Sequence, residues 1–256
     1  MTRLTSPVLT LLVLLGLVAC GQPNAGSTNS AIAAAASEAA SATAAPTRTP
    51  RPTASPTPPP AECPALASAE GSACQIVPAT ANIFGAGRDA PPAPGGGGGG
   101  TLPPAWPVSA GATTMRVVDA AGLVVPISGM SGANDAGGDG IGRTAVTSWE
   151  GISGISHPDN GMFLVGVFLT DAVPSGEAPQ GLSFNSTTED FEELAPEIAQ
   201  TFFVGDGAGR TFIVPSGATR LFLGFADAYL YEGEPGWYQN NLGQLAVTVE
   251  FEGTTE

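Results

Sequence analysis

The stretch MFLVGVFL, residues 162–169, is apolar at every position except Gly166, which has no side chain. A strand with one solvated face alternates apolar and polar residues, and this stretch does not alternate. An apolar run of this length, bounded by turn residues, favours a strand that is covered on both faces. We therefore predict a buried inner strand over residues 162–170.

Outward from this run, segments rich in Val, Phe, Leu and Ile alternate with turns of Gly, Pro, Asn and Asp, which is the pattern of short strands. We predict strands over residues 113–120, 124–127, 145–149, 162–170, 181–184, 200–204, 211–214, 220–225 and 244–252. A strand-like run also begins at Ile76, and the hexaglycine stretch 95–100 is an insert between early strands.

Residues 188–199 form the one segment that favours a helix, with Thr188 as its cap. Phe191, Leu194 and Ile198 fall on one helical face, and Pro196 limits the helix to about two turns. Many short strands with at most one short helix predict an all-β fold, a jelly-roll (galactose-binding-like) β-sandwich over residues 76–254.

The N-terminus predicts export. Arg3 precedes an apolar run that is too short to span a bilayer, and the run ends in Leu17-Val18-Ala19-Cys20. This ending resembles the bacterial lipobox, which implies a signal peptide over 1–19 and a lipidated Cys20. An ordinary secretory signal with a chance Cys is the alternative. We expect a protein that is lipid-anchored at the bacterial cell surface or envelope and touches the membrane only through the lipid.

Residues 20–62, rich in Ala, Ser, Thr and Pro, have too few large apolar groups to fold and predict a disordered stalk. In the next segment, 63–75, Cys63 and Cys74 are predicted to form a disulfide, because an exported protein meets an oxidising compartment. Two thiols without a nearby His or further Cys are a poor metal site.

Charge and residue types exclude several functions. The net charge is −15, Lys is absent, and no basic face is available for nucleic acid. His157 is the single His, no G-x-S-x-G string accompanies it, and zinc ligands are lacking. We therefore predict a protein that is not an enzyme. A glycan-active hydrolase with two carboxylates stays as the weakest alternative.

The C-terminal stretch FADAYLYEGEPGWYQNNLG, residues 225–243, predicts a metal site. It places Asp227 after one predicted strand and Asn240-Asn241 before the last, with a Pro235-Gly236 turn between them. Carboxylates, amides and backbone carbonyls such as that of Trp237 are the oxygen ligands that calcium takes. The alternative is that Asp and Asn only shape turns.

This stretch resembles the bacterial calcium-dependent galactophilic lectins (the LecA-like family) and related calcium-dependent xylan-binding modules. The resemblance implies that Asp227, Asn240 and Asn241 bind calcium and a sugar together, and that Trp237 adds its carbonyl. A further carbonyl ligand falls somewhere in 126–132. The chain departs from the family by inserting AYLYEG, residues 228–233, where a sugar would enter.

Aromatic residues beside the proposed site fit a sugar, because C–H faces of sugars stack on rings. We predict that Trp237 and Tyr231 are exposed for such contact and that Tyr238 fills the core. Two further stretches are interpreted as turns. SHPDNG around His157 is similar to a sugar-contacting string of the lectins, so a sugar contact is the alternative for the first stretch. The second is the loop with Asn134, Asp135 and Asp139, which is interpreted as a solvated turn near the first site, with a second cation site as the alternative.

Together these features predict a surface lipoprotein that binds carbohydrate through calcium. A structural or adhesive envelope protein, whose calcium only stabilises loops, is the rival interpretation. The sugar and the oligomeric state are left open.

Overall fold

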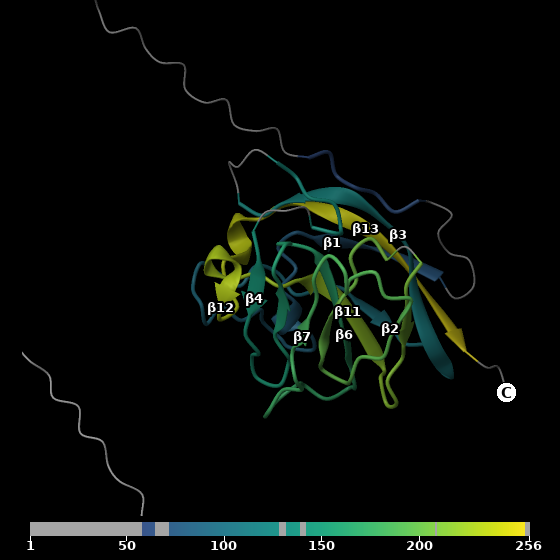
Figure 1. The fold of residues 1–256 in the computed structure, drawn as a ribbon. Helices are drawn as coiled ribbons and strands as arrows, with labels where there is room; N and C mark the ends of the chain where they lie inside the picture. Colours follow the sequence, from purple (N-terminus) through teal and green to yellow (C-terminus); the bar gives the residue numbers. More distant parts are fainter. Residues whose placement is uncertain (1–57, 65–71, 128–131, 139–141, 208, 254–256) are drawn as a thin grey trace, which may run out of the picture. The chain divides into compact units, whose positions relative to one another are not determined.

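A computed structural model describes residues 58–64, 72–127, 132–138, 142–207 and 209–253 (Figure 1). Cys20, the predicted signal peptide and nearly all of the predicted stalk lie outside this range, and so does Asp139. Within it, no helix is both long and apolar enough to cross a membrane.

The described chain is built from strands in three sheets, joined by loops and three short 3-10 helices. The first sheet has the order β1 (Ser72–Pro78), β13 (Leu242–Gly253), β3 (Ala112–Val125), β10 (Thr211–Ile213) and β8 (Glu193–Leu194). The second has the order β2 (Ala105–Pro107), β11 (Arg220–Phe225), β6 (Leu164–Leu169) and β9 (Thr201–Phe203). The third has the order β12 (Glu232–Gly233), β4 (Thr144–Val146), β5 (Ile155–His157) and β7 (Leu182–Ser183). The 3-10 helices are η1 (Ile83–Gly85), η2 (Tyr229–Tyr231) and η3 (Tyr238–Asn240).

The first two sheets form a jelly-roll β-sandwich. Its eight main strands, in chain order, are β1, β2, β3, β6, β9, β10, β11 and β13. The first sheet pairs the first, eighth, third and sixth of these, and the second pairs the second, seventh, fourth and fifth. Two Greek keys folded onto one another give this order. The fold class expected from the strand pattern is therefore confirmed.

Strand β6 is buried at all six positions, as predicted for an inner strand. Successive side chains of a strand point to opposite faces. Leu164 and Phe168 pack in the core shared with the first sheet, whereas Val165, Val167 and Leu169 pack in a second core beneath the third sheet. The third sheet explains why this strand shows no polar alternation. It covers the face that a two-layer sandwich would leave to solvent.

Strand β3 corrects one boundary. The sequence predicted separate strands over 113–120 and 124–127, with Gly122 in the gap between them, but a single strand runs through all of 112–125. Gly122 pairs with Leu245 of β13 at a φ of 131°, and a Cβ there would lie 2.4 Å from the Gln244 carbonyl oxygen. This glycine allows close backbone approach within a strand rather than ending one. The two long strands, β3 and β13, lie side by side across the molecule (Figure 1).

The helix predicted over 188–199 is wrong. Asn185 accepts hydrogen bonds from the Thr187 and Thr188 amides, so Thr188 belongs to a single turn. The chain then extends, and β8 pairs in parallel with β10. The apolar residues predicted to share a face (Phe191, Leu194 and Ile198) do pack on the core, but from an extended segment.

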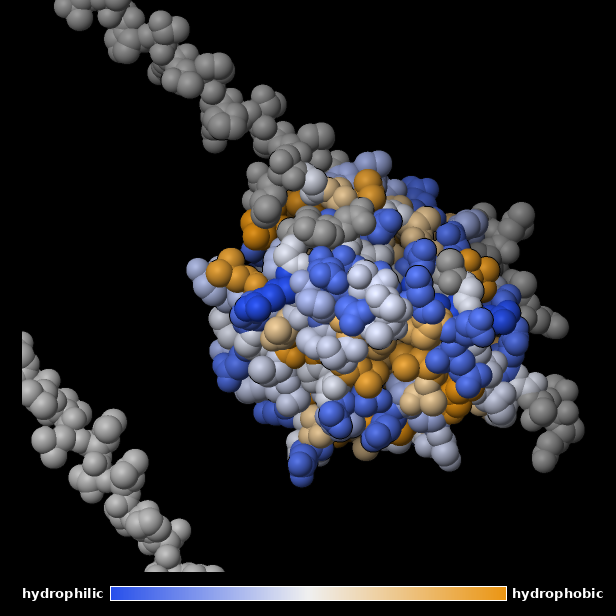
Figure 2. Space-filling model, viewed as in Figure 1, coloured by the Kyte–Doolittle hydropathy of each residue, from blue (hydrophilic) through white to orange (hydrophobic). Residues whose placement is uncertain are grey.

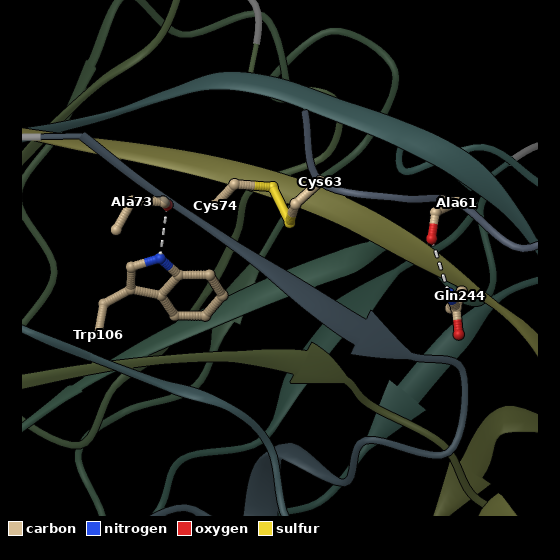
Figure 3. Close-up of a disulfide and its surroundings, with 6 residues drawn as sticks. All are labelled: Ala61, Cys63, Ala73, Cys74, Trp106 and Gln244. Carbon is tan, nitrogen blue, oxygen red and sulfur yellow. Dashed lines mark hydrogen bonds between the residues drawn. A yellow bond between two sulfur atoms is a disulfide. The ribbon is translucent and has the colours of Figure 1, made fainter. Parts of the chain in front are cut away.

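The predicted disulfide between Cys63 and Cys74 is present (Figure 3). Cys74 lies in β1, which begins at Ser72, so the Cys-pair segment is joined directly to the first sheet. The residues before Cys63 are also attached to this sheet, because the Gln244 side chain of β13 donates a hydrogen bond to the Ala61 carbonyl at 2.7 Å. Below β1, Trp106 donates its indole N–H to the Ala73 carbonyl at 2.9 Å.

Candidate functional site

A cavity of about 190 Å³ opens at the C-terminal loops. These loops include η2 and η3, which lie at the same edge of the molecule as β12 (Figure 1). Its lining comes from the segment that follows β3, from the residues after β11 with the insertion, and from Trp237 and Asn240 at the two ends of η3. The lining residues are Pro126, Ile127, Asp227, Ala228, Tyr229, Leu230, Tyr231, Trp237 and Asn240. Four of the five predicted ligand residues line it, and the fifth, Asn241, is bonded to one of them. Chain segments that lie far apart in the sequence therefore meet where the site was predicted.

Asp227 is the charged group of this site, and its side chain is almost completely buried. One carboxylate oxygen accepts the Ala228 amide at 2.8 Å, and the other accepts the Asn241 side-chain N–H at 2.9 Å. Loss of solvent raises the pKa of the Asp227 carboxyl to about 7, although these two hydrogen bonds lower it. Among the described residues, no basic side chain forms an ion pair with this carboxylate. The site therefore contains a buried carboxylate that lacks a compensating positive charge.

Three more oxygen atoms around Asp227 are buried and have no hydrogen-bond partner among the described residues. They are the Tyr231 hydroxyl, Asn240 Oδ1 and Asn241 Oδ1. The orientation of the Asn241 amide is fixed, because its nitrogen donates both to Asp227 and to the Ala79 carbonyl at 3.2 Å. Buried polar atoms in folded proteins nearly always have partners, so these three oxygens are available to water, to a polar ligand or to a cation.

Trp237 is held by the hexaglycine insert. Its backbone N–H donates to the Gly96 carbonyl at 3.0 Å and its indole N–H to the Gly95 carbonyl at 3.1 Å. A Cβ on Gly97 would lie 2.3 Å from Trp237 Cδ2, so only glycine lets the loop lie against the ring. From the sequence, the six glycines predicted only an insert. A run of glycines contains no signal for the contact with Trp237.

The inserted segment forms η2, and its residues divide between solvent and core. Tyr229 and Leu230 are exposed, at 59% and 68%, and the Tyr229 ring packs against Trp237 at a tilt of 48°, with ring centroids 5.1 Å apart. Figure 2 shows apolar atoms at this edge of the molecule. The prediction that Tyr231 is exposed is wrong. Tyr231 is only 9% exposed because its left-handed backbone, with a φ of 61°, turns the ring into the core.

The two other aromatic residues of the site, Trp237 and Tyr238, differ in burial. Trp237 is half-buried under the glycine loop rather than fully exposed. Tyr238 fills the core as predicted, and its hydroxyl donates to the Phe225 carbonyl at 3.0 Å. The same hydroxyl accepts the Asp227 amide N–H at 3.0 Å, which ties η3 to the end of β11.

His157 shapes a turn, as the interpretation of SHPDNG held. It is fully buried, and its Nδ1 accepts the amides of Asp159 and Asn160 at 3.2 and 3.1 Å. The remaining nitrogen, Nε2, contacts Glu189 Oε2 at 2.8 Å. Glu189 lies in the segment where the helix was predicted, and its carboxylate meets this buried His.

The loop with Asn134 and Asp135 is a turn, but it is not fully exposed to solvent. Asn134 is buried and donates its side-chain N–H to the Gly161 carbonyl at 3.1 Å. Asp135 accepts the Gly137 amide at 2.8 Å, which closes a local turn. Both side chains thus have structural roles.

Within the described ranges, no group of three or more His, Cys, Asp or Glu side chains is placed to hold a metal. The rim site therefore depends on a single carboxylate with amide, hydroxyl and carbonyl oxygens. Comparison of the chain with protein-family models, curated proteins and solved structures finds no match.

Proposed function

We propose that this protein binds carbohydrate through calcium at the rim cavity, and that it does so as a lipoprotein anchored through Cys20 at the bacterial surface. One observation carries the proposal. Among the described residues, three buried oxygens without hydrogen-bond partners, from Tyr231, Asn240 and Asn241, accompany the buried Asp227 carboxylate at an aromatic cavity.

The donor set fits a hard cation. Calcium takes six to eight oxygens from carboxylates, amides, carbonyls and neutral ligands. Asp227, Asn240 and Asn241 would hold it through side chains, and Trp237 through its carbonyl. When bound, calcium would supply positive charge and open coordination positions for ligand hydroxyls. A neutral organic group alone would leave the charge of Asp227 uncompensated.

The affinity expected of this donor set is low. Calcium affinity in proteins depends on the number of charged ligands, and extracellular modules bind with Kd values of about 10⁻⁴ to 10⁻³ M. One carboxylate places this site at that weak end. Weak binding suits a surface protein, because many copies on one surface strengthen the attachment to a polysaccharide.

The cavity walls favour a sugar as the ligand. The rings of Tyr229 and Trp237 meet at 5.1 Å and stand at the opening with much of Tyr229 in solvent. Aromatic rings of this kind offer apolar faces that C–H groups of a pyranose stack against. The inserted residues form a wall of the cavity and leave it open.

A purely structural calcium site is the second candidate, and the backbone favours it at one point. Leu230, Tyr231 and Trp237 have φ values of 53°, 61° and 70°, which are left-handed and unfavourable for these residues. A cation that bound these loops together would offset such strain. The two candidates differ in whether a sugar binds.

Calcium titration of the thermal midpoint tests the metal. With a Kd of 10⁻⁴ to 10⁻³ M, 10 mM calcium stabilises the native state by about 1.4–2.7 kcal/mol. For a domain of this size the Tm then rises by about 3–10 °C above the value in EDTA. Asp227→Asn abolishes the rise. Asp119→Asn, at an exposed acid of β3, keeps it.

Isothermal titration with sugars then separates the two candidates. Calcium-dependent heat of binding that is lost in Asp227→Asn supports the carbohydrate-binding function. A calcium effect on the Tm with no sugar binding supports the structural role. A Tm that is identical in EDTA and in calcium would overturn the metal site.

A further inference from the structure

The lining of the rim cavity is mostly apolar and contains few polar atoms. The polar atoms belong to the ligand set around Asp227 and to the tyrosine hydroxyls. The rest of the lining is aliphatic or aromatic carbon, contributed by Pro126, Ile127, Ala228, Leu230 and the rings. A ligand that enters therefore meets few hydrogen-bonding groups and mostly apolar surface.

The apolar side is largely a product of the inserted segment. Leu230 lines the cavity and yet is 68% exposed, so its side chain remains available to a ligand. The loop that contains Leu230 is closed where Ala228 bridges to Pro235 through the Gly236 amide and the Asp227 carbonyl, and the Tyr231 amide donates to the Ala228 carbonyl at 3.0 Å. Unfavourable backbone angles persist only where the surroundings enforce them, and they concentrate at ligand sites. The insertion thus presents a fixed apolar side chain at the cavity mouth.

The size of the cavity limits the ligand to one ring-sized group. Pockets for drug-sized ligands measure about 300–1,000 Å³, and this one measures about 190 Å³. A single terminal sugar ring therefore enters it, while the rest of a glycan stays outside.

A fully hydroxylated hexose suits only half of this environment. Hydroxyls at the edge beside Asp227 find oxygen acceptors and the proposed calcium. A hydroxyl placed against Ile127 or Leu230 loses its water and gains no partner, whereas a methyl group there gains from burial. We infer that the preferred ligand is a 6-deoxyhexose, whose C6 methyl contacts the Ile127 and Leu230 side of the cavity. This inference depends on the proposed function and names the ligand class of that same site.

Matched sugar pairs test the inference, because each pair differs by one hydroxyl. The full-length chain in 10 mM calcium is titrated calorimetrically with D-galactose and 6-deoxy-D-galactose, and with D-glucose and 6-deoxy-D-glucose. A hydrophobic pocket discriminates such partners by about 10–100-fold. We expect at least a tenfold tighter Kd for the deoxy sugar of the pair that binds.

The outcomes separate this inference from the proposed function. Equal calcium-dependent affinity within a binding pair, or tighter binding of the hydroxylated sugar, would overturn the 6-deoxyhexose preference and leave calcium-dependent carbohydrate binding intact. Binding of none of the four sugars would overturn both. Deoxy-sugar binding that persists in EDTA and in Asp227→Asn would retain the preference and overturn the calcium mechanism.

A variant at the apolar wall provides the second test. Leu230→Asn places a polar amide against the ligand, and Asn tolerates the left-handed φ of 53° better than Leu, so folding is preserved. The preference for the deoxy sugar should fall below threefold. Val173→Asn, at another exposed apolar side chain that does not line the cavity, should keep the full preference. An unchanged preference in Leu230→Asn would contradict the role of this wall.

Discussion

The Asp227 carboxylate accepts a hydrogen bond from the Asn241 side-chain amide at 2.9 Å, and both residues are 2% exposed. Asp227 follows β11 of the second sheet, and Asn241 directly precedes β13 of the first. The contact therefore joins the two sheets of the sandwich at the rim, and it does so around an ionisable group.

The metal-free protein should lose stability as the pH rises from about 4 to about 7. Asp227 has a pKa of about 7 in the native state and 3.8 ordinarily, so in this window the native state retains a proton that the unfolded chain has released. The free energy of unfolding then falls with pH, by up to about 4 kcal/mol in total, and levels off above pH 7. Urea unfolding in EDTA at a series of pH values measures the slope.

Asp227→Asn isolates this contribution, because Asn does not titrate and still accepts the Asn241 amide. The unfolding free energy of the native protein minus that of the variant should decrease across pH 4–7 and then stay constant. Saturating calcium should also remove the slope, since a bound cation keeps the carboxylate ionised. Parallel pH profiles for the native protein and the variant in EDTA would refute the assignment.

Alanine substitutions at neighbouring positions of the hexaglycine loop should differ in how much they destabilise the protein. Gly97→Ala places a Cβ 2.3 Å from Trp237 Cδ2, whereas Gly96→Ala meets nothing within 4 Å. Both positions are left-handed, at φ values of 64° and 83°, and each costs about 1–2 kcal/mol for that reason. Overpacking should add about 1–3 kcal/mol at Gly97 alone. Chemical denaturation of both variants checks this, and equal losses would show that the ring moves aside freely.

Removing the disulfide should destabilise the sandwich measurably. Cys63 and Cys74 are 11 residues apart in sequence, and a loop of that length constrains the unfolded chain by about 3 kcal/mol. The Cys63→Ser/Cys74→Ser double variant should therefore melt about 6–12 °C below the native protein. Reductant should lower the Tm of the native protein by a similar amount and leave the variant unchanged. A reductant effect on the double variant would point to another cause.

The sequence was sufficient for the elements whose side chains report burial directly. The limits of β11 were predicted as residues 220–225, and the two-sided burial of β6 followed from its missing alternation. Gly122 misled because glycine marks both turns and close backbone approach, and only pairing with Leu245 decides between them. The short β2 gave no periodic signal, since three residues are fewer than two periods of a strand.

For the candidate site, the residue types could be predicted but their surroundings could not. Asp227 and Asn241 were recognised by their chemistry, and the fold brings them together across an intervening loop. The inward turn of Tyr231 depends on a left-handed backbone that no residue preference favours. The contact of Gly97 with Trp237 joins positions 140 apart in the chain, and a single sequence contains no signal for such a pair.

Glu189 should stabilise the fold through its contact with buried His157. Nδ1 of His157 accepts two backbone amides, so Nε2 carries the proton and donates to Glu189 Oε2 at 2.8 Å. Glu189→Ala leaves this N–H without its acceptor and should cost about 1–3 kcal/mol. Glu189→Gln retains an acceptor oxygen and should cost less than about 1 kcal/mol. Glu192→Ala, at an exposed acid of the same segment, should stay within about 0.5 kcal/mol of the native protein. Urea unfolding ranks the three variants, and nitrogen NMR of the imidazole identifies the tautomer. If Gln proves as damaging as Ala, or if the proton resides on Nδ1, this hydrogen bond is not what holds the His157 turn.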